Sequence, residues 1–328
     1  MSAPQTPGMT DEYDERVDAV VIGGGAAGLN GALMLARSKR AVVVVDAGAP
    51  RNAPAEAVHG LLARDGTPPA ELLRAGREEV LRYGGRILDG EVADAAVAEG
   101  GFAVTLTSGR VLSARRLLLA TGLVDVLPDI PGLAAHWGHD LVHCPYCHGW
   151  EVRDRPIGIL ATSTASVHQA LLFRQLSDDV VYLENGHRLD ADARDRLAAI
   201  DVPLVEGRVT AVESDSGRIS GARLDDGRLV AREVLAVATR VEARVAGFRS
   251  LGVRVDDLPG GTGTTVHADE FGRTGVPGVW AAGNVSSAMA QVGAAAAAGA
   301  LAGAQINADI AAEDADRAVE RRRSAARA

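Results

Sequence analysis

The feature that most constrains this sequence is a glycine-rich turn that follows a short apolar run. Residues 17–22 are rich in valine, and they lead into the run Gly-Gly-Gly-Ala-Ala-Gly at 23–28 and then into a helical pattern over 29–37. A second apolar strand over 41–45 ends at Asp46. A strand, a glycine turn, a helix and a second strand within about thirty residues are typical of the βαβ unit that binds dinucleotides.

Each glycine of the turn has a separate predicted role. Gly23 permits the tight turn, Gly25 lets the backbone approach a pyrophosphate, and Gly28 allows the helix to pack closely on the strand. The helix N-terminus then faces the phosphates, and Asp46 can accept hydrogen bonds from a ribose diol. We therefore expect nucleotide contacts from Gly23, Gly25, Ala26, Ala27, Gly28 and Asp46.

The same pattern repeats in the middle of the chain, where residues 156–183 read as strand, helix and strand. Ala161, Ser163 and Ser166 stand where the three glycines would be, and each added Cβ crowds a turn that needs positive φ or close ligand approach. The residues that follow Glu184 include no arginine pair to hold a 2′-phosphate. The repeat is therefore predicted to keep the scaffold and to lose the nucleotide cradle.

Length and composition exclude several classes of protein. A chain of 328 residues favours two domains or one large α/β unit. Its 47% hydrophobic and 23% charged residues are typical of a globular protein. A net charge of −9, with Lys39 as the single lysine, argues against a nucleic-acid partner. No apolar run reaches 18 residues, and residues 1–16 lack the features of a signal peptide, so we expect a cytoplasmic protein with no membrane contact.

A domain boundary is expected after the first third of the chain. Residues 117–120 form an apolar strand that ends in the turn Thr121-Gly122, and a proline-bearing crossing over 125–131 follows. Residues 233–239 read as the crossing back. The segment between the two crossings is then an inserted domain.

The last part of the chain contains another strand and a helix. The segment 276–284 ends an apolar strand in a glycine turn, and an alanine-rich helix is expected over 291–306. Residues 311–328 alternate in charge and are expected to be helical or frayed. They carry no functional signal in the sequence.

Both cysteines of the chain, Cys144 and Cys147, lie in a single CxxC motif. A disulfide that closes so short a loop is constrained, which makes it a candidate for an exchangeable bridge that transfers electrons. His148 follows the second cysteine and His143 precedes the first. Either imidazole could hold a sulfur as thiolate or take a proton from an incoming thiol.

Two other interpretations of the motif stay open. His136 and His139 precede the cysteines and could complete four ligands for zinc. The cysteines could also be an inert buried pair. Neither alternative explains the nearby dinucleotide fold, whereas a disulfide beside a flavin does.

These motifs together resemble the low-molecular-weight thioredoxin reductase family over almost the whole chain. The resemblance rests on the first glycine turn, the Ala-Thr-Gly turn at 120–122, the CxxC inside the second βαβ unit and the late segment 277–284. It implies an α/β fold of two doubly wound, Rossmann-like dinucleotide-binding domains, the second inserted into the first, and a homodimer. The implied division is an FAD-binding domain at 1–124 and 241–328, and a pyridine-nucleotide-binding-like domain with a degenerate site at 125–240.

Within that family, the run Cys-Pro-Tyr-Cys-His-Gly-Trp-Glu at 144–151 and the loop over 50–60 resemble the dithiol oxidase branch. Those enzymes close disulfides in natural products such as holomycin and gliotoxin. Thioredoxin reductases have an acidic residue, a glycine and an arginine where this chain has His148, Ser163 and Asn185. These departures point away from reduction driven by NADPH.

The resemblance also implies roles for single residues. Cys147 is the sulfur nearest the flavin, Cys144 meets the substrate, and His148 is the base, with His143 as the other candidate. Gln291 and Val292 begin a helix whose amides face the isoalloxazine edge. Asn284 stands where much of the family has aspartate, and Arg51 could equally be a solvated surface charge. The further FAD contacts expected are Arg51, Asn52, His59, Thr121, Gly122, Gly283 and Asn284, and no metal ligand is expected.

The function expected from these observations is an FAD-dependent dithiol oxidase. Such an enzyme forms an intramolecular disulfide in a small natural-product dithiol and passes the electrons to molecular oxygen, giving hydrogen peroxide. One alternative is a thioredoxin reductase-like disulfide reductase that uses NAD(P)H, because Glu184 could still bind a ribose diol. The other is a non-catalytic flavin-dependent redox sensor.

Overall fold

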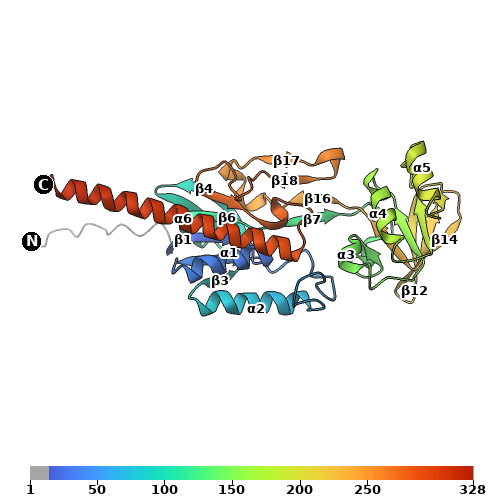
Figure 1. The fold of residues 1–328 in the computed structure, drawn as a ribbon, viewed down its shortest axis with the longest axis horizontal. Helices are drawn as coiled ribbons and strands as arrows, with labels where there is room; N and C mark the ends of the chain where they lie inside the picture. The colour runs from blue at the N-terminus through green and yellow to red at the C-terminus, as the bar shows by residue number, and fades with distance from the viewer. Residues whose placement is uncertain (1–14, 328) are drawn as a thin grey trace, which may run out of the picture.

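The computed structural model describes residues 15–327, which fold into a larger and a smaller lobe joined by a narrow neck (Figure 1). The smaller lobe is formed by the middle of the chain, and the larger lobe by the segments on either side of it. This is the α/β fold of two Rossmann-like domains that the sequence predicts, and that prediction is confirmed. Most of the N-terminal segment 1–16 lies outside the described residues, which begin at residue 15.

The larger lobe is built on a seven-stranded mixed sheet in the order β3-β2-β1-β6-β5-β4, with β19 also paired to β6. Strands β1, β2 and β6 are parallel, and Ile22 lies opposite both Val45 and Leu119. The turns that follow these three strands therefore meet at one edge of the sheet. The strands are β1 (Glu15–Ile22), β2 (Val42–Asp46), β3 (Arg86–Asp89), β4 (Val92–Ala98), β5 (Gly101–Leu106), β6 (Val111–Leu119) and β19 (Val279–Ala281).

Helices from opposite ends of the chain pack against each other in this lobe. The helices are α1 (Ala26–Arg37), α2 (Pro69–Arg82) and α6 (Val292–Ala325). A Cβ on Gly299 of α6 would lie 1.9 Å from the carbonyl oxygen of Ala27, and one on Gly303 would lie 2.5 Å from that of Gly31. Only glycine allows the two backbones to approach so closely, and this contact brings the start of α6 beside the first glycine turn.

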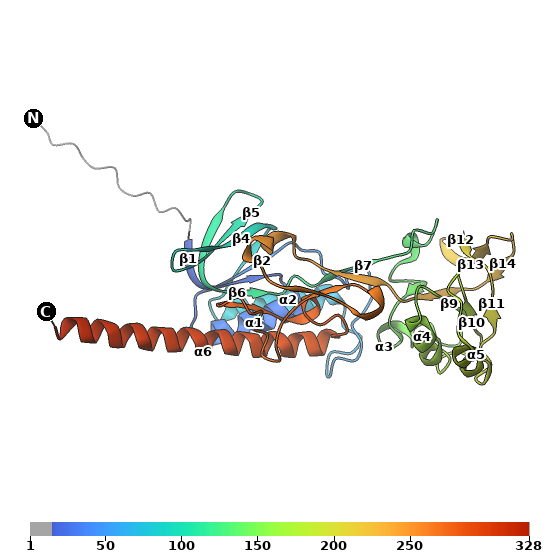
Figure 2. The same cartoon turned by 90° about the horizontal axis from the view of Figure 1, so that it is seen from above.

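Helix α6 runs past residue 306 to Ala325, so the tail that was expected to be helical or frayed is helical up to that residue, and its far end projects beyond the lobe (Figure 2). Glu313 accepts hydrogen bonds from Arg115 at 2.8 Å and from Arg116 at 3.0 Å, so β6 holds the middle of the helix. The charges of the tail thus anchor the helix. Among the described residues, no helix is both long and apolar enough to cross a membrane.

The smaller lobe contains a parallel sheet in the order β11-β10-β9-β15-β8 and an antiparallel sheet in the order β12-β13-β14. The strands are β8 (Leu141–Val142), β9 (Ile157–Leu160), β10 (Val180–Leu183), β11 (Leu204–Val205), β12 (Val209–Asp215), β13 (Arg218–Leu224), β14 (Leu229–Ala231) and β15 (Val234–Val237). The helices are α3 (Pro145–His148), α4 (Ala165–Phe173) and α5 (Ala191–Ala198). The prediction of a crossing at 233–239 is wrong, because β15 is a fully buried strand between β9 and β8.

The neck consists of two antiparallel strands, β7 (Leu123–Val126) and β16 (Arg240–Ala243). Val126 lies opposite Arg240, and Leu123 lies opposite Ala243. A hairpin in the larger lobe adds β17 (Val255–Asp257) and β18 (Thr264–Val266), and short 3-10 helices cover Ala134–His136, Ala246–Leu251, Pro259–Gly261 and Gly283–Val285. The strands by which the chain enters and leaves the smaller lobe therefore lie side by side.

The contact between α1 and α6 predicts that Gly299→Ala is destabilising. The new Cβ would meet the backbone of Ala27, so the helices must separate, and we expect the free energy of unfolding to fall by about 1–3 kcal/mol. Urea unfolding measures this change. Gly293→Ala in the same helix is the matched control, since its Cβ meets only Leu61 at 3.5 Å. If both variants were equally stable, the packing described here would be wrong.

Candidate active site

A cavity of about 1290 Å³ lies where the edge of the larger sheet, the neck and the CxxC helix α3 come together. Predicted site residues from distant parts of the sequence line this one cavity. They are Gly23, Gly25, Ala26, Ala27, Asp46, Arg51, Asn52, His59, Thr121, Gly122, Cys144, Cys147, His148, Asn284, Gln291 and Val292. Gly28 and Gly283 do not line it, and both pack against neighbouring backbone or side chains behind it.

The first glycine turn leaves room at the cavity for a phosphate group. Gly23 has a φ of +109°, and a Cβ there would lie 2.3 Å from the carbonyl oxygen of Ala120. A Cβ on Gly28 would lie 1.8 Å from the carbonyl oxygen of Gly23, whereas one on Gly25 would meet nothing within 4 Å. No side chain caps the N-terminus of α1. Its free amides beside the open space at Gly25 fit a pyrophosphate.

Asp46 is held in place at the end of β2. The backbone N–H of Gly24 donates to its Oδ1 at 3.1 Å, and Arg77 of α2 donates to its Oδ2 at 3.0 Å. The carboxylate lines the cavity and keeps acceptor capacity for a ribose diol. Arg77 was not singled out from the sequence, because nothing local marks a residue of α2 as a partner of β2.

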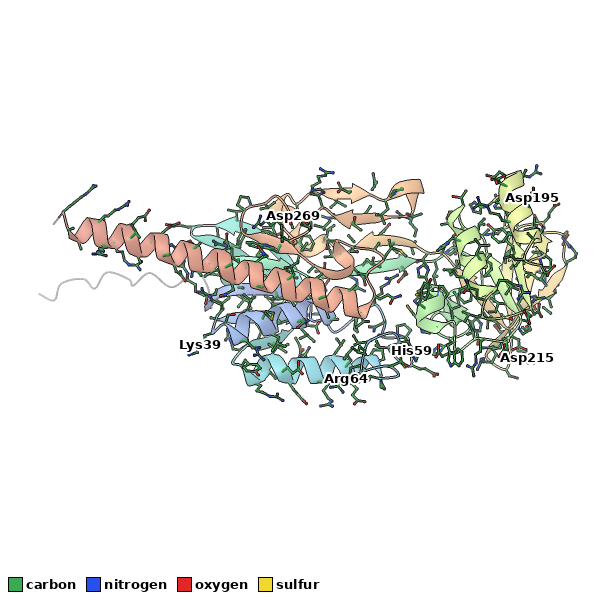
Figure 3. All side chains as sticks on the ribbon, viewed as in Figure 1. Lys39, His59, Arg64, Asp195, Asp215 and Asp269 are labelled. Carbon is green, nitrogen blue, oxygen red and sulfur yellow. The ribbon has the colours of Figure 1, made fainter. Side chains whose placement is uncertain are left out.

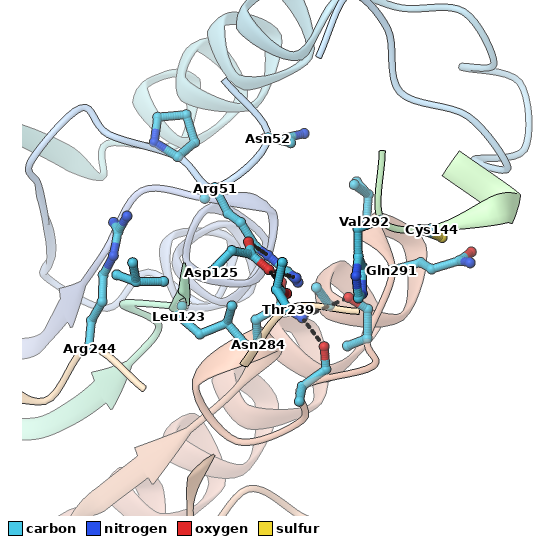
Figure 4. Close-up of a pocket in the computed structure, with 18 of the residues that line it drawn as sticks. Arg51, Asn52, Leu123, Asp125, Cys144, Thr239, Arg244, Asn284, Gln291 and Val292 are labelled. Atoms are coloured by element: carbon cyan, nitrogen blue, oxygen red, sulfur yellow. Dashed lines mark hydrogen bonds and ion pairs between the residues drawn. The ribbon is translucent and has the colours of Figure 1, made fainter. Parts of the chain in front are cut away.

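Asn284 fixes the loop that leads into α6. Its Nδ2 donates to the carbonyl oxygens of Ser287 at 3.1 Å and Ala290 at 2.8 Å (Figure 4). An aspartate could not donate these bonds, which explains why an amide suits this position. Gln291 then precedes α6 as its N-cap without a capping hydrogen bond, and Val292 begins the helix. The uncapped amides of this helix end therefore face the same cavity.

In the turn of the second βαβ unit, serine side chains accept hydrogen bonds from backbone amides. Ser166 is fully buried, and its Oγ accepts a hydrogen bond from the backbone N–H of Thr162 at 3.1 Å. The Oγ of Ser163 accepts one from the N–H of Ala165 at 3.2 Å. Two amides of the turn are therefore bound to serine hydroxyls of the chain, and the amide of Ala165 is at the start of α4.

The residues that follow this turn also form hydrogen bonds and an ion pair within the protein. Glu184 is buried and forms an ion pair with Arg194 at 2.5 Å. The side chain of Asn185 donates to the carbonyl oxygen of Ala161 and accepts from the N–H of Val209. The acid that would bind a ribose in a nucleotide site thus has an internal partner instead.

The two cysteines are half-buried thiols at the N-terminal end of α3. The thiol of Cys147 donates to Cys144, and with the backbone N–H groups of Tyr146 and Cys147 it lowers the pKa of Cys144 to about 7. The same hydrogen bond, together with burial, raises the pKa of Cys147. In the reduced pair, deprotonation is therefore favoured at Cys144, and Cys147 retains its proton more readily.

Two histidines flank the motif, and burial lowers the pKa of both. Nδ1 of His143 lies 2.9 Å from the carbonyl oxygen of Val237 and donates to it, which fixes the tautomer. Nε2 of His148 is buried and has no hydrogen-bond partner within residues 15–327. Both imidazoles are neutral near pH 7 and can accept a proton, and His148 directly follows the thiol that holds one.

Arg51 is not a free surface charge, since it forms a two-point ion pair with Asp125 of β7 at 2.6 and 2.7 Å (Figure 4). Thr239 also donates to Asp125 at 2.6 Å. Burial alone would raise the pKa of Asp125, but the bonds from Arg51 and Thr239 outweigh it and lower that pKa. All three residues line the cavity. Asp125 and Thr239 were missed in the sequence because their partner lies in a distant loop.

The zinc alternative does not fit this arrangement. His136 is buried, and its Nε2 lies 2.7 Å from the hydroxyl of Ser214. In the part of the chain that the structure describes, no group of three or more histidine, cysteine or acidic side chains is placed to hold a metal ion. The cysteines face the dinucleotide turn across one cavity instead.

The pKa of Cys144 gives a prediction for the reduced protein. Because this pKa is lowered to about 7, the thiolate forms above that pH, and alkylation by iodoacetamide should rise with a midpoint near pH 7. Cys147→Ala removes the hydrogen bond that contributes most, so the midpoint should move upward. Cys144→Ser should remove the rapid alkylation that this thiolate gives. Identical midpoints with and without Cys147 would contradict this assignment.

Comparisons with known proteins identify the family of this chain. The chain matches the pyridine nucleotide-disulphide oxidoreductase family over residues 17–299. It is 34% identical to the thioredoxin reductase tcpT of Claviceps purpurea over 296 residues, which cover 84% of this chain and 88% of that protein. It is 31% identical to the thioredoxin reductase aclD of Aspergillus oryzae, over 83% of this chain and 89% of that protein.

Solved structures give the same result. The crystal structure of HlmI superposes with a TM-score of 0.87 at 45% identity, covering 95% of this chain and 96% of that one. An oxidoreductase from Agrobacterium tumefaciens gives a TM-score of 0.85 at 35% identity, over 90% and 98% of the two chains. The resemblance read from the motifs is confirmed, and the first turn and the start of α6 fit the flavin nucleotide. The chain belongs to the pyridine nucleotide-disulphide oxidoreductase family and is an FAD-binding oxidoreductase of the thioredoxin reductase type.

Proposed function

We propose that this protein is a dithiol oxidase that closes an intramolecular disulfide in a small molecule and uses molecular oxygen as the electron acceptor. One observation carries the proposal. The CxxC pair shares a cavity with the open glycine turn, while the second turn has its amides bound by Ser163 and Ser166. Electrons can therefore enter through the sulfurs, and the route through a nicotinamide lacks its usual cradle.

The exchange steps follow from the chemistry of the two sulfurs. A substrate thiolate attacks Sγ of Cys144 in the Cys144–Cys147 disulfide, which forms a mixed disulfide and releases Cys147. The second substrate thiolate then attacks the substrate sulfur of the mixed disulfide, and the product leaves as a ring. Cys144 is the leaving group of this step, and its lowered pKa favours departure as thiolate.

His148 supports the return of the pair to the disulfide. In the reduced pair the raised pKa of Cys147 keeps its proton in place, so a base is needed before this sulfur can react. The neutral imidazole of His148 is adjacent and can take that proton. FAD, when bound, accepts the two electrons of the dithiol and delivers them to oxygen. The sum is one dithiol and one oxygen giving one disulfide and one hydrogen peroxide.

A disulfide reductase is the second candidate, favoured by the names of the relatives from Claviceps purpurea and Aspergillus oryzae, which are thioredoxin reductases. It would require a reduced nicotinamide to reach the flavin. Glu184 is buried, lies outside the cavity lining and pairs with Arg194, which speaks against a ribose contact at that position. The two candidates therefore differ in the molecule that donates electrons.

Anaerobic mixing separates the two candidates. We expect dithiothreitol, as the simplest dithiol probe, to remove the flavin absorbance of the yellow protein, and NADH and NADPH to leave it unchanged. Air should then restore the absorbance with one hydrogen peroxide per dithiol. Cys144→Ser and Cys147→Ser should each lose this reaction while retaining flavin. Rapid loss of absorbance with NADPH and none with dithiols would establish the reductase instead.

The homodimer implied by the family resemblance is part of the same proposal. Light scattering of the flavin-loaded protein should then give a mass about twice the 33.9 kDa of one chain. Dilution should not change this mass in the micromolar range, because stable dimers bury large apolar areas. A mass of one chain would remove the dimer from the proposal without affecting the chemistry.

A further inference from the structure

Two exposed apolar side chains lie at the rim of the candidate active-site cavity. Tyr146 of α3 is 67% exposed, Met289 of the loop before α6 is 87% exposed, and both line the cavity. Large apolar side chains are usually buried, because their contact with water costs free energy. Exposed apolar groups that gather at a cavity favour a surface that a ligand covers.

Tyr146 belongs to the CxxC motif itself. Its backbone N–H is hydrogen-bonded to the sulfur of Cys144, which fixes the start of α3 relative to that sulfur. At the other end of α3, a Cβ on Gly149 would lie 2.3 Å from Cδ1 of Leu176, so the helix packs closely on the smaller lobe there. The phenol ring is left exposed at the cavity, between the two cysteines in sequence.

Met289 is held at the cavity by the backbone of its loop. The side-chain amide of Asn284 donates to the carbonyl oxygens of Ala288 at 3.3 Å and Ala290 at 2.8 Å, which flank Met289. The backbone on both sides of this residue is therefore fixed, while its side chain stays in contact with solvent. A flexible thioether on a fixed backbone can adapt to the shape of a bound group.

The CxxC segment and the loop before α6 meet at the loop between β2 and α2. His59 of that loop lies on the side of the larger lobe that faces α3 (Figure 3), and its Nε2 is 3.3 Å from Oε1 of Glu151. A Cβ on the next residue, Gly60, would lie 3.8 Å from Oε1 of Gln291. Figure 4 shows Gln291 beside Cys144 in agreement with this bridge. The exposed side chains of the two segments therefore border one opening.

The side chains that flank the sulfurs are neutral or paired. Burial lowers the pKa of His143 and of His148, so both imidazoles are neutral near pH 7. Arg51 lines the cavity, but Asp125 binds it at two points. A charged substrate would find no free counter-ion among these four groups, whereas an uncharged substrate needs none.

We propose that Tyr146 and Met289 determine the substrate specificity of this site by holding the apolar body of the dithiol while its sulfurs reach Cys144. The inference rests on the proposed dithiol oxidation and names its substrate class, which is a small uncharged dithiol with an aromatic or otherwise apolar body. Neither side chain exchanges bonds or protons. Each is removed from water when such a substrate binds, which favours an apolar body over a polar one.

The test compares two dithiols that close disulfide rings of the same size. Dithiothreitol and benzene-1,2-dimethanethiol both form six-membered rings, but the first carries two hydroxyl groups and the second a benzene ring. Anaerobic stopped flow follows flavin absorbance and gives the half-saturating concentration and the limiting rate for each dithiol. We expect the unaltered protein to reach half saturation at a lower concentration of the aromatic dithiol.

The variants should change binding of the aromatic dithiol selectively. Tyr146→Ala and Met289→Ala should each raise its half-saturating concentration about fivefold to tenfold, which is the range for loss of one aromatic or sulfur–aromatic contact. The limiting rate with either dithiol, and half saturation with dithiothreitol, should change less than about twofold. Tyr146→Phe keeps the ring and should keep the preference.

Trp150→Ala is the matched control. Trp150 is an aromatic residue of the same segment and is 65% exposed, but it lies outside the cavity lining and the guanidinium of Arg153 covers its ring at 4.1 Å. This variant should keep the preference of the unaltered protein.

The outcomes separate this inference from the proposed function. Flavin-loaded alanine variants that keep the preference, or that weaken both dithiols equally, would overturn the specificity role alone. A lower mass by light scattering with an unchanged preference would assign Tyr146 and Met289 to a contact with a second copy of the chain instead. An unaltered protein whose flavin neither dithiol reduces would overturn the proposed function as well.

Discussion

The arrangement of the site depends on the ion pair between Arg51 and Asp125 at the neck. Arg51 comes from the loop after β2, Asp125 from the strand that leaves the larger lobe, and Thr239 from the residue before the strand that returns. A buried carboxylate is stable only with such partners. Because these three segments meet at one point, the CxxC helix is held over the cavity that begins at the glycine turn.

The two βαβ units show how one scaffold can keep or lose a ligand site. Backbone amides at such a turn must be paired with some acceptor when they are buried. In the first unit no side chain caps α1, and the space at Gly25 is open. In the second unit Ser166 accepts the amide of Thr162. The difference is a few side-chain atoms, and in the proposed function it determines which molecule exchanges electrons with the protein.

Prediction from sequence succeeded where the constraint was local and failed where it was distant. The glycine turn, its flanking strand and helix, and the altered second turn could be inferred because a few adjacent residues determine backbone conformation. Strand β15 was mistaken for a crossing, since four apolar residues do not reveal their neighbours. The sequence left the tail after residue 311 as either helical or frayed, because Arg115 and Glu313, whose hydrogen bond anchors it, are 198 positions apart.

The sequence by itself determined the two Rossmann-like units and the placement of both cysteines in one CxxC motif, because each depends on spacing within a short segment, and its family resemblance indicated the flavin nucleotide. Only the tertiary structure decided which of the two thiols has the lowered pKa, that Arg51 is paired, and that His59 lies beside Glu151. These properties depend on hydrogen bonds and charges between side chains from separate segments. Such distances are set by how the lobes meet, and no local pattern in the chain encodes them.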